Sequence, residues 1–472
     1  YSNNFVLVHN GIIENYLDIK NILSKNNIKC ISQTDSEVVV NMIELNYNKL
    51  KNVELAIQKT ILQLQGTWGL VILTIYEPNT LYCTRKGSPL LVSVNDNLGL
   101  IASEQSAFCN KTNNYIALNN NDICKIQVED GIVKMTTGEK YNKLKINNKF
   151  TDLTPHPYKH WTEKEIYEQV DSSLRAISLG GRLLSNNKVK LGGLMDHKKQ
   201  LLEIENLIIL GCGTSYFAGL CGKKYLKDLC DFNSVQVIDG AEFELNDIPK
   251  NGKTGLLLLS QSGETKDLHC CLEMCKDLDI IKIGLVNVVD SLIAREVDCG
   301  CYLNAGREVG VASTKSFTSQ VILLSMMSIW FSQNKNTNLQ KRIKHIRDLR
   351  KLYLDIENTL HGNDLDSILK LFENKNNCFI LGKEKGESIA KEAALKIKEI
   401  SYIHAEGYSS SSLKHGPFAL LEPEFPVILI APDNKYFSKN MNAYEEIKNI
   451  YTALGVRLGT EEDERALNLE KL

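Results

Sequence analysis

Residues 256–265 read LLLLSQSGET, an apolar run that passes directly into a loop of hydroxyl side chains with one glycine. Such a run is typical of a strand buried on both faces of a parallel sheet. The next residues, 266–274, repeat apolar positions at helical spacing, so the loop should precede a helix. Free N–H groups and the helix dipole favour an anion there, which predicts a phosphate site. The alternative is that Ser262 or Thr265 only caps the helix.

A second loop of the same design lies about 50 residues earlier, where residues 207–215 read LIILGCGTS. Its glycines let the backbone approach a ligand closely, and two further hydroxyls follow them. The carboxyl ends of adjacent parallel strands share one crevice, so the two loops together predict a sugar-phosphate pocket. The loop at 260–265 has no lysine and no Walker spacing, which favours a phosphate monoester over a nucleoside triphosphate with Mg²⁺. The candidate sugar-phosphate contacts are Cys212, Gly213, Thr214, Ser215, Ser260, Gln261, Ser262 and Thr265.

The composition indicates a large globular protein and excludes several classes. A chain of 472 residues with 43% hydrophobic content predicts two or three domains with real cores. A net charge of −2 offers no basic block for nucleic acid, so no nucleic-acid partner is expected. The longest apolar stretch, Val321–Phe331, is too short to span a bilayer and predicts a buried helix, with no membrane partner. The 13 cysteines are scattered and include no Cys-x-x-Cys pair, which predicts a cytoplasmic protein without disulfides or zinc. No other metal and no cofactor are expected.

The chain divides into segments of different pattern. Residues 1–148 alternate short strands with amphipathic helices, and two prolines near residue 155 open a linker that is expected to run over 149–205. Strand–helix alternation then fills 206–335, charged connecting helices follow at 336–371, and a weak repeat of the first lobe occupies 372–450. The repeat is carried by CFILG at 378–382, which echoes LIILG at 207–211. Two doubly wound lobes are therefore predicted, followed by a divergent tail at 451–472.

Several motifs resemble a known enzyme family. The two loops are similar to the phosphate-binding loops of sugar isomerase (SIS) domains. Three further strings resemble the glutamine–fructose-6-phosphate aminotransferase (isomerizing) family: VGVASTK at 309–315, AALKIKEI at 393–400 and LKHGP at 413–417. The resemblance covers roughly residues 5–450. It implies an α/β chain with a partial N-terminal-nucleophile-type glutaminase domain over 1–148, followed by two doubly wound parallel-sheet SIS lobes.

The same resemblance implies an activity and its partners. The family releases ammonia from glutamine and adds it to fructose 6-phosphate, which gives glucosamine 6-phosphate and glutamate for UDP-N-acetylglucosamine biosynthesis. A homodimer or higher homo-oligomer is implied as well. A rival from another class stays open, because SIS domains also serve as non-catalytic regulators that bind sugar phosphates.

A candidate glutamine site lies near the start of the chain, where residues 6–15 read VLVHNGIIEN. The amide of Asn10 and the backbone N–H of Gly11 follow a predicted strand and could face one oxygen, which is the geometry of an oxyanion hole. An Asn-Gly hairpin turn is the structural alternative. The resemblance assigns the oxyanion hole to Asn10 and Gly11, and glutamine α-ammonium binding to Asp35. From its position alone, Asp35 is predicted to be a helix N-cap.

The isomerisation needs a carboxylate that carries a proton between two neighbouring carbons, and a buried carboxylate with a raised pKa suits that role. Glu399 is the candidate base, with Lys396 on the same helical face; a plain surface ion pair is the alternative. The resemblance makes His415 the histidine that opens the sugar ring and that is supplied by the neighbouring subunit. It also adds Val311 and Ser313 to the sugar-phosphate contacts.

The resemblance places two further catalytic groups outside the matching part of the chain. The glutaminase nucleophile of the family is a cysteine at the mature N-terminus, upstream of Tyr1, and the resemblance fades after about Ile450, before the Schiff-base lysine of the family. The chain as written is therefore not expected to hydrolyse glutamine.

Overall fold

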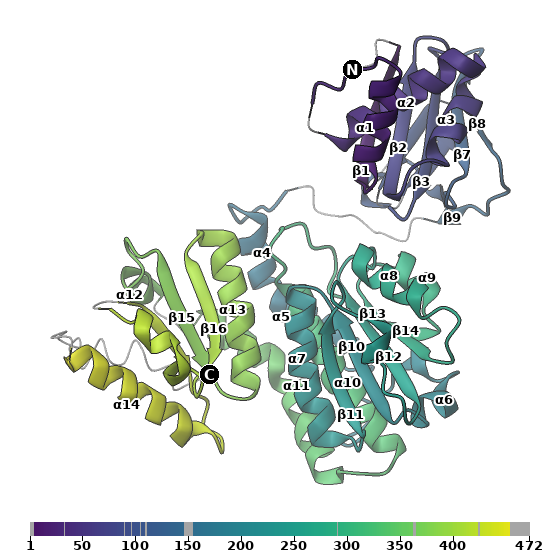
Figure 1. Cartoon of the computed structure of the whole chain (residues 1–472). Helices are drawn as coiled ribbons and strands as arrows, with labels where there is room; N and C mark the ends of the chain where they lie inside the picture. The colour runs from purple at the N-terminus through teal and green to yellow at the C-terminus, as the bar shows by residue number, and fades with distance from the viewer. Residues whose placement is uncertain are drawn as a thin grey trace. The chain divides into compact units, whose positions relative to one another are not determined.

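The structure is a computed structural model that describes residues 4–453, apart from 33, 89, 96, 104, 109–110, 146–153, 290, 362–364 and 423–424. Most of the expected tail at 451–472 therefore lies outside the described residues. The chain forms two compact units, Tyr1–Leu153 and Thr154–Leu472 (Figure 1). Each unit is described by itself.

Unit 1 contains two antiparallel sheets. The first has the strand order β1-β2-β3-β7-β8, with β1 Phe5–Ile13, β2 Gly66–Thr74, β3 Thr80–Lys86, β7 Ile123–Glu129 and β8 Ile132–Thr137. The second has the order β5-β4-β6-β9, with β5 Leu98–Ala102, β4 Leu91–Asn95, β6 Asn114–Ala117 and β9 Leu144–Lys145. The helices of this unit are α1 Tyr16–Lys25, α2 Asp35–Leu50, α3 Val53–Ile61 and the 3-10 turn η1 Gln105–Phe108.

The first sheet is the middle layer of unit 1. Its one face buries Leu70 and Ile72 against Ile43 of α2, so helices α1–α3 cover that side. Its other face packs Cys83 against Val92 of the second sheet. The layers are therefore helix, sheet and sheet, and strand β1 lies at the edge of the middle layer.

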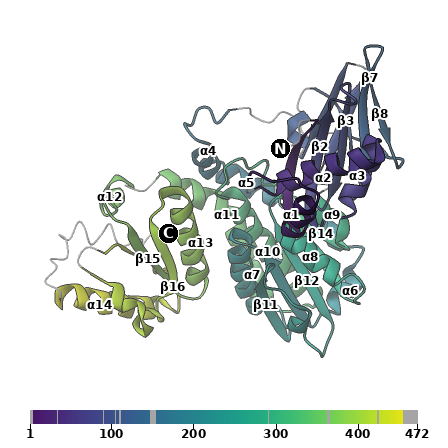
Figure 2. The same cartoon turned by 45° about the horizontal axis from the view of Figure 1, so that its top comes forward.

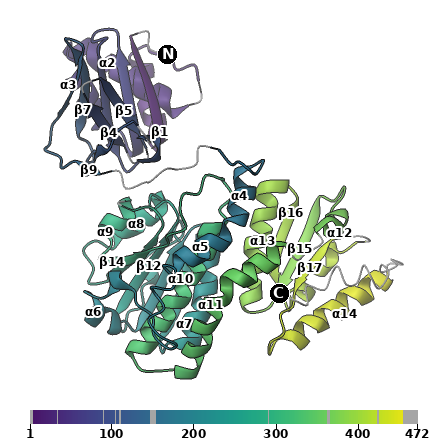
Figure 3. The ribbon, with the colours of Figure 1, turned by 180° about the vertical axis from the view of Figure 1, so that it is seen from behind.

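The first lobe of unit 2 is a five-stranded parallel sheet. Its strand order is β11-β10-β12-β13-β14, with β11 Ser234–Asp239, β10 Asn206–Gly211, β12 Thr254–Ser260, β13 Ile281–Val286 and β14 Cys299–Tyr302. One face is covered by α7 Thr214–Leu229, α10 Lys315–Asn334 and α11 Leu339–His361, the other by α8 Lys266–Met274 and α9 Leu292–Glu296 (Figures 1 and 3). A short 3-10 turn, η3 Leu245–Asp247, precedes β12.

The second lobe of unit 2 is a smaller parallel sheet. Its order is β16-β15-β17, with β16 His404–Ser409, β15 Asn377–Gly382 and β17 Val427–Ile430. Helix α13 Lys385–Ser401 covers one face and α14 Phe437–Ala453 the other, as Figure 2 shows from a second direction. The remaining elements are α12 Leu365–Lys370 and the turns η4 Leu413–His415 and η5 Pro417–Leu420. The prediction of an α/β chain with two parallel-sheet lobes is confirmed.

The expected linker contributes to unit 2. Its helices are α4 Trp161–Tyr167, α5 Gln169–Ala176 and α6 Lys198–Leu202, with the turn η2 Gly192–Leu194. Leu183, Leu191 and Leu201 belong to the core of the first lobe, because their apolar side chains pack under the five-stranded sheet. The segment after residue 160 is thus part of the lobe's packing.

The four leucines at 256–259 lie in the central strand β12, buried on both faces as predicted. Leu256–Leu259 are all fully buried, since both faces of β12 are covered by helices. Strands β10 and β12 are parallel neighbours with Ile209 opposite Leu257, so the loops that follow them leave the same edge of the sheet. Val321–Phe331 lies within α10, which is confirmed as a buried helix. Among the described residues, no helix combines the length and hydropathy that a membrane crossing needs.

Candidate functional site

The loop after β12 is held by its own hydroxyls. Ser260 Oγ accepts the Gly263 N–H at 2.9 Å and lies 2.9 Å from Thr265 Oγ1, while Ser262 Oγ accepts the Glu264 N–H at 3.1 Å. Thr265 is the N-cap residue of α8, but its side chain makes no capping hydrogen bond. The capping alternative is therefore wrong for this loop, because its hydroxyls bond to one another and to the turn.

The loop after β10 begins helix α7 with a glycine. Gly213 takes a positive φ of 54°, which allows Thr214 and Ser215 to form the first turn of α7. Ser215 Oγ accepts a hydrogen bond at 2.9 Å from the Nε2 of Gln320 on α10. The buried Gln320 Oε1 has no hydrogen-bond partner among the described residues, so this amide is held from one side only.

Helix α13 of the second lobe meets this loop through a polar cluster, which we call the Lys396 cluster: Thr214, Glu392, Lys396 and Glu399. Lys396 Nζ donates to Thr214 Oγ1 at 3.0 Å and to Glu399 Oε2 at 2.5 Å, and lies 3.6 Å from Glu392 Oε1. Thr214 Oγ1 donates to Glu392 Oε1 at 3.1 Å. The structure therefore brings a predicted sugar-phosphate contact from one lobe together with the predicted base and lysine from the other.

The burial in the Lys396 cluster differs from the expectation. The Glu399 side chain is 36% exposed, whereas the Glu392 side chain is only 7% exposed. The pKa of Glu392 is raised to about 7, chiefly by burial and also by the nearby Glu399, while Lys396 and Thr214 oppose the shift. Sequence reasoning missed Glu392, although its position one turn before Lys396 is a signal that places it on the same helical face.

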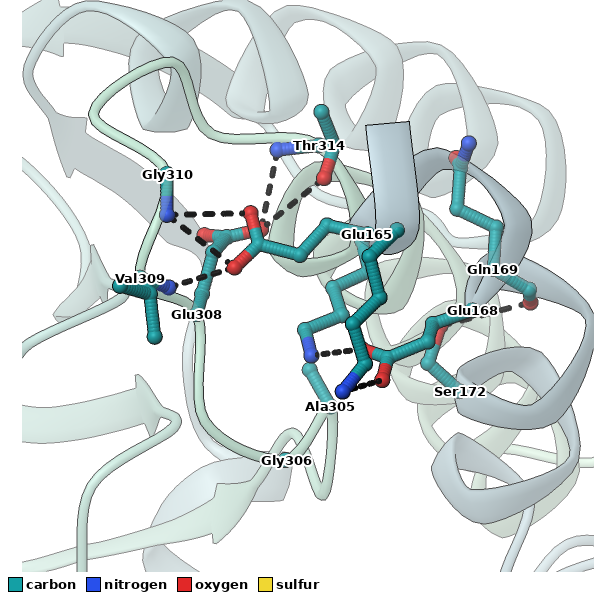
Figure 4. Close-up of polar contacts among 12 residues, drawn as sticks. Glu165, Glu168, Gln169, Ser172, Ala305, Gly306, Glu308, Val309, Gly310 and Thr314 are labelled. Carbon is teal, nitrogen blue, oxygen red and sulfur yellow. Dashed lines mark hydrogen bonds and ion pairs between the residues drawn. The ribbon is translucent and has the colours of Figure 1, made fainter. Parts of the chain in front are cut away.

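The loop before α10 carries two more predicted contacts and is drawn in Figure 4. Glu165 Oε1 accepts the N–H groups of Val309 at 2.5 Å and Gly310 at 3.1 Å, and burial raises the pKa of this carboxyl. Ser313 Oγ donates to Glu308 Oε2 at 2.8 Å, so its hydroxyl is already engaged. Val311 is fully exposed at the tip. Two carboxylates, Glu165 and Glu308, therefore hold this loop through hydrogen bonds.

Glu308 completes the hold on this loop and was missed from the sequence. Its Oε1 accepts the N–H groups of Thr314 at 2.9 Å and Ser316 at 3.1 Å at the start of α10. A carboxylate is favoured there by the positive end of the helix dipole. The free N–H groups of Thr314 and Ser316 at the start of α10 are therefore already bonded to the Glu308 carboxylate.

His415 lies on η4 with an exposed side chain, and its backbone N–H donates to Ser412 O at 3.0 Å. The turn is anchored by Leu413, which is fully buried in the core of the second lobe. The remaining predicted contacts, Cys212 and Gln261, are partly buried in the loops after β10 and β12.

Asn10 and Gly11 of the candidate glutamine site neither follow a strand nor form a turn. Asn10 and Gly11 lie within strand β1, opposite Gly69 and Trp68 of β2, and the strand continues to Ile13. The alternative of an Asn-Gly hairpin turn is therefore wrong. Asn10 is exposed on the edge strand.

Asp35 is brought against the same strand. Its Oδ2 accepts the Ile13 N–H at 2.9 Å, and its Oδ1 lies 3.6 Å from Nδ1 of His9. Thr34 is the N-cap residue of α2 and Asp35 is the first helical residue, so the prediction that Asp35 is the N-cap is wrong. Asp35 instead links α2 to the strand that carries Asn10 and Gly11.

A side chain at Gly11 is expected to destabilise unit 1, because strand β2 leaves no room for it. Its φ is +147°, and an added Cβ would lie 2.2 Å from the Thr67 carbonyl oxygen of β2. Gly11→Ala should destabilise unit 1 by about 3 kcal/mol, because a rigid backbone atom must move and φ is strained. Urea unfolding followed by fluorescence or circular dichroism measures this loss.

Gly131→Ala is the matched control for this substitution. Gly131 also has a positive φ, +80°, but an added Cβ would meet nothing within 4 Å. Its cost should be near 1 kcal/mol, which reflects the backbone conformation alone. Equal losses in the two variants would contradict the close approach of β1 and β2.

One group of side chains has the composition of a cation site. The ligand atoms of His269, Glu273 and Glu296 lie within 4.8 Å of one another, and His269 Nδ1 is 2.8 Å from Glu296 Oε2. The two glutamates are exposed, and the histidine–glutamate ion pair accounts for the geometry. We assign no metal to this group.

The sequence matches two families of domains. Residues 1–110 match the glutamine amidotransferase domain family, and residues 200–329 and 371–449 match the SIS domain family. The matched ranges place Asn10, Gly11 and Asp35 in the first family and the Lys396 cluster in the second.

Similar proteins cover nearly the whole chain. A probable glutamine–fructose-6-phosphate aminotransferase (isomerizing) of Acanthamoeba polyphaga mimivirus is 41% identical over 95% of this chain and 73% of its own length. The glutamine–fructose-6-phosphate aminotransferase (isomerizing) of Aquifex aeolicus is 35% identical over 94% of this chain and 72% of its own length. Among solved structures, the C-terminal domain of glucosamine-fructose-6-phosphate aminotransferase from Francisella tularensis matches with a TM-score of 0.58 and 31% identity. That match covers 63% of this chain and 83% of the other.

Proposed function

This chain belongs to the glutamine–fructose-6-phosphate aminotransferase (isomerizing) family, and from this premise we propose how its two units divide the reaction. The reaction is the glutamine-dependent amination and isomerisation of fructose 6-phosphate to glucosamine 6-phosphate, a step of amino-sugar synthesis. Unit 1 handles glutamine, and unit 2 handles the sugar phosphate.

Unit 2 binds fructose 6-phosphate at the edge of the five-stranded sheet. The hydroxyls of the loops after β10 and β12 donate to the phosphate. Ser262 Oγ only accepts within its loop, so its O–H proton is available, whereas Ser260 and Thr265 share one hydroxyl–hydroxyl bond. The observation that carries this assignment is the Lys396 cluster, because it sets the Glu399–Lys396 pair of the second lobe against Thr214 of the first.

The isomerisation follows from the position of Glu399. Its carboxylate removes the proton from one of the first two sugar carbons and returns it to the other, so the base is regenerated and no redox partner is needed. Lys396 holds this carboxylate from 2.5 Å and stabilises negative charge that develops on the sugar oxygens. His415, on its exposed turn, opens the sugar ring in the site of a second subunit of a homodimer.

Unit 1 positions glutamine along strand β1. Asp35 binds the α-ammonium, and Asn10 and Gly11 donate to the oxyanion that forms when the side-chain amide is attacked. The link between Asp35 and the Ile13 N–H supports this arrangement, because it ties the ammonium-binding group to the oxyanion-hole strand. We place the protein in the cytoplasm, in the pathway to UDP-N-acetylglucosamine. Disulfides are rare in that compartment, and the described cysteines are free thiols.

The phosphate assignment is tested at a single hydroxyl. Ser262→Ala should weaken fructose 6-phosphate binding by about 10- to 100-fold, because a charge-assisted hydrogen bond of about 1.5–3 kcal/mol is lost. Isothermal titration calorimetry on the purified protein measures the change. Ser234→Ala is the matched control: its hydroxyl lies at the opposite end of the same sheet, on Asn206 at 2.8 Å, so affinity should not change. Unchanged affinity in Ser262→Ala would refute the site.

A further inference from the structure

Glu392 stands apart in the Lys396 cluster because it is a buried carboxyl at a substrate-binding loop with no assigned role. Its Oε1 accepts the Thr214 hydroxyl at 3.1 Å, and its Oε2 is buried with no hydrogen-bond partner among the described residues. A buried carboxylate oxygen without a partner is costly, so this carboxyl is poised to take up a proton.

The hydroxyl of Thr214 has only one proton to give. In the structure that proton goes to Glu392, while one of the Thr214 lone pairs accepts from Lys396 Nζ at 3.0 Å. A threonine hydroxyl carries one donor and two acceptor sites, so Thr214 in this state has no donor left for a ligand. Donation to a sugar phosphate requires that Glu392 release the Thr214 proton.

We propose that Glu392 is a proton-linked positioning residue, which must be protonated before Thr214 can donate to the sugar phosphate. In the protonated state the Glu392 O–H donates to Thr214 Oγ1, and the Thr214 proton turns to the ligand. No bond to carbon forms or breaks in this step, and the proton comes from solvent. The proposal rests on the sugar-phosphate site proposed above and deepens it.

The surroundings of Glu392 agree with this linkage. The charged and titratable groups near it are Lys396 and Glu399 on α13 and the Cys221 thiol on α7. Strands β15 and β16 meet α13 through the apolar side chains of Cys378, Ile380 and Ala405. The pKa of Glu392 is already raised to about 7, chiefly by burial, and the Thr214 hydrogen bond opposes that shift, so loss of this bond on ligand binding would raise the pKa further.

The affinity for fructose 6-phosphate should therefore depend on pH. A carboxyl whose pKa rises on binding takes up a proton, so fructose 6-phosphate should bind more tightly below pH 7 and more weakly above it. The second ionisation of a phosphate monoester falls near pH 6, so between pH 7 and 8.5 the ligand itself contributes little.

Calorimetry in buffers of different ionisation enthalpy measures the linkage directly. At pH 7.5 we expect wild-type protein to take up roughly one half to three quarters of a proton per fructose 6-phosphate bound, because about a quarter of Glu392 is already protonated there. Glu392→Gln should take up none and should bind with an affinity that is flat from pH 7 to 8.5, because its amide N–H₂ donates to Thr214 at every pH. Thr214→Val should also lose the linkage, with affinity at pH 7 reduced to the wild-type value at pH 8.5.

Failure of the Glu392 role and failure of the proposed function would give different results in this experiment. Proton uptake that persists in Glu392→Gln, or wild-type binding without any uptake, would overturn the role of Glu392 while leaving the sugar-phosphate site intact. Wild-type protein that binds no fructose 6-phosphate at all would overturn the proposed function itself. If Glu392→Gln fails to fold, Thr214→Val decides the question, since loss of linkage there is required and persistence contradicts the proposal.

Discussion

Glu399→Gln in the natural protein is expected to lower the isomerisation rate by roughly 10²–10⁴-fold, the usual contribution of a general base. The amide keeps the size and hydrogen-bonding capacity of the carboxylate but has no basic oxygen. Because Glu399 lies about a third exposed at the end of the Lys396 cluster, folding should be unaffected and the affinity for fructose 6-phosphate should change little. Steady-state assay of glucosamine 6-phosphate formation, with separate kcat and KM, measures the effect.

The competing interpretation is a surface ion pair between Glu399 and Lys396. It predicts a near-normal rate and a stability loss of at most about 1 kcal/mol. Glu387→Gln is the matched control, because it breaks a partly exposed glutamate–lysine pair with Lys391 on the same helix, outside the Lys396 cluster. It should leave kcat close to the wild-type value. Glu399→Gln with more than about a tenth of wild-type turnover and intact folding refutes the assignment of the base.

Asn10→Ala is expected to lower the glutaminase kcat of the natural protein by about 10²–10³-fold, which is typical for the loss of one oxyanion-hole donor. The KM for glutamine should change little, because the oxyanion exists only in the transition state. Asn10 lies on an edge strand with its side chain exposed, so the substitution leaves the core of unit 1 intact. Release of glutamate from glutamine measures this rate.

Two further variants provide a control and a separate test of glutamine binding. Asn114→Ala removes an exposed asparagine from strand β6 of the same unit and should leave glutamate release unchanged. Asp35→Asn should instead raise the KM for glutamine, because a neutral amide attracts the α-ammonium less strongly than a carboxylate does. A large loss of kcat in Asn114→Ala, or none in Asn10→Ala, would mean that the oxyanion hole lies elsewhere.

Local patterns predicted the parallel lobes well because each pattern has a direct physical cause. Four consecutive leucines before Ser260 can be buried on both faces only in a sheet covered by two helical layers, and β12 is such a strand. The repeat at CFILG likewise predicted β15. The position of the loops at one sheet edge then follows from parallel pairing.

The predictions that failed depended on contacts distant in sequence. An Asn-Gly pair favours a tight turn locally, but pairing with Gly69 and Trp68 keeps Asn10 and Gly11 extended. Thr265 has the right position for a helix cap, yet Ser260 engages its hydroxyl. Tertiary hydrogen bonds replaced the local ones in both cases.

The polar groups that sequence reasoning missed share the same origin. Glu392 lies where α13 of one lobe packs on α7 of the other, so its burial cannot be inferred from its own helix. Glu165 and Glu308 shape the loop before α10, but Glu165 lies more than 140 residues before the backbone it holds. Spacing along one helix could suggest Glu392, whereas only the fold shows Glu165.

A crystal structure of the natural protein with glucitol 6-phosphate, an open-chain analogue that cannot isomerise, would show directly where the sugar phosphate binds. The phosphate is expected within hydrogen-bond distance of Thr214, Ser262 and Thr265. The Glu399 carboxylate is expected over the first two carbons of the analogue. A phosphate bound away from the loops after β10 and β12, or a Glu399 carboxylate that faces solvent in the complex, would contradict it.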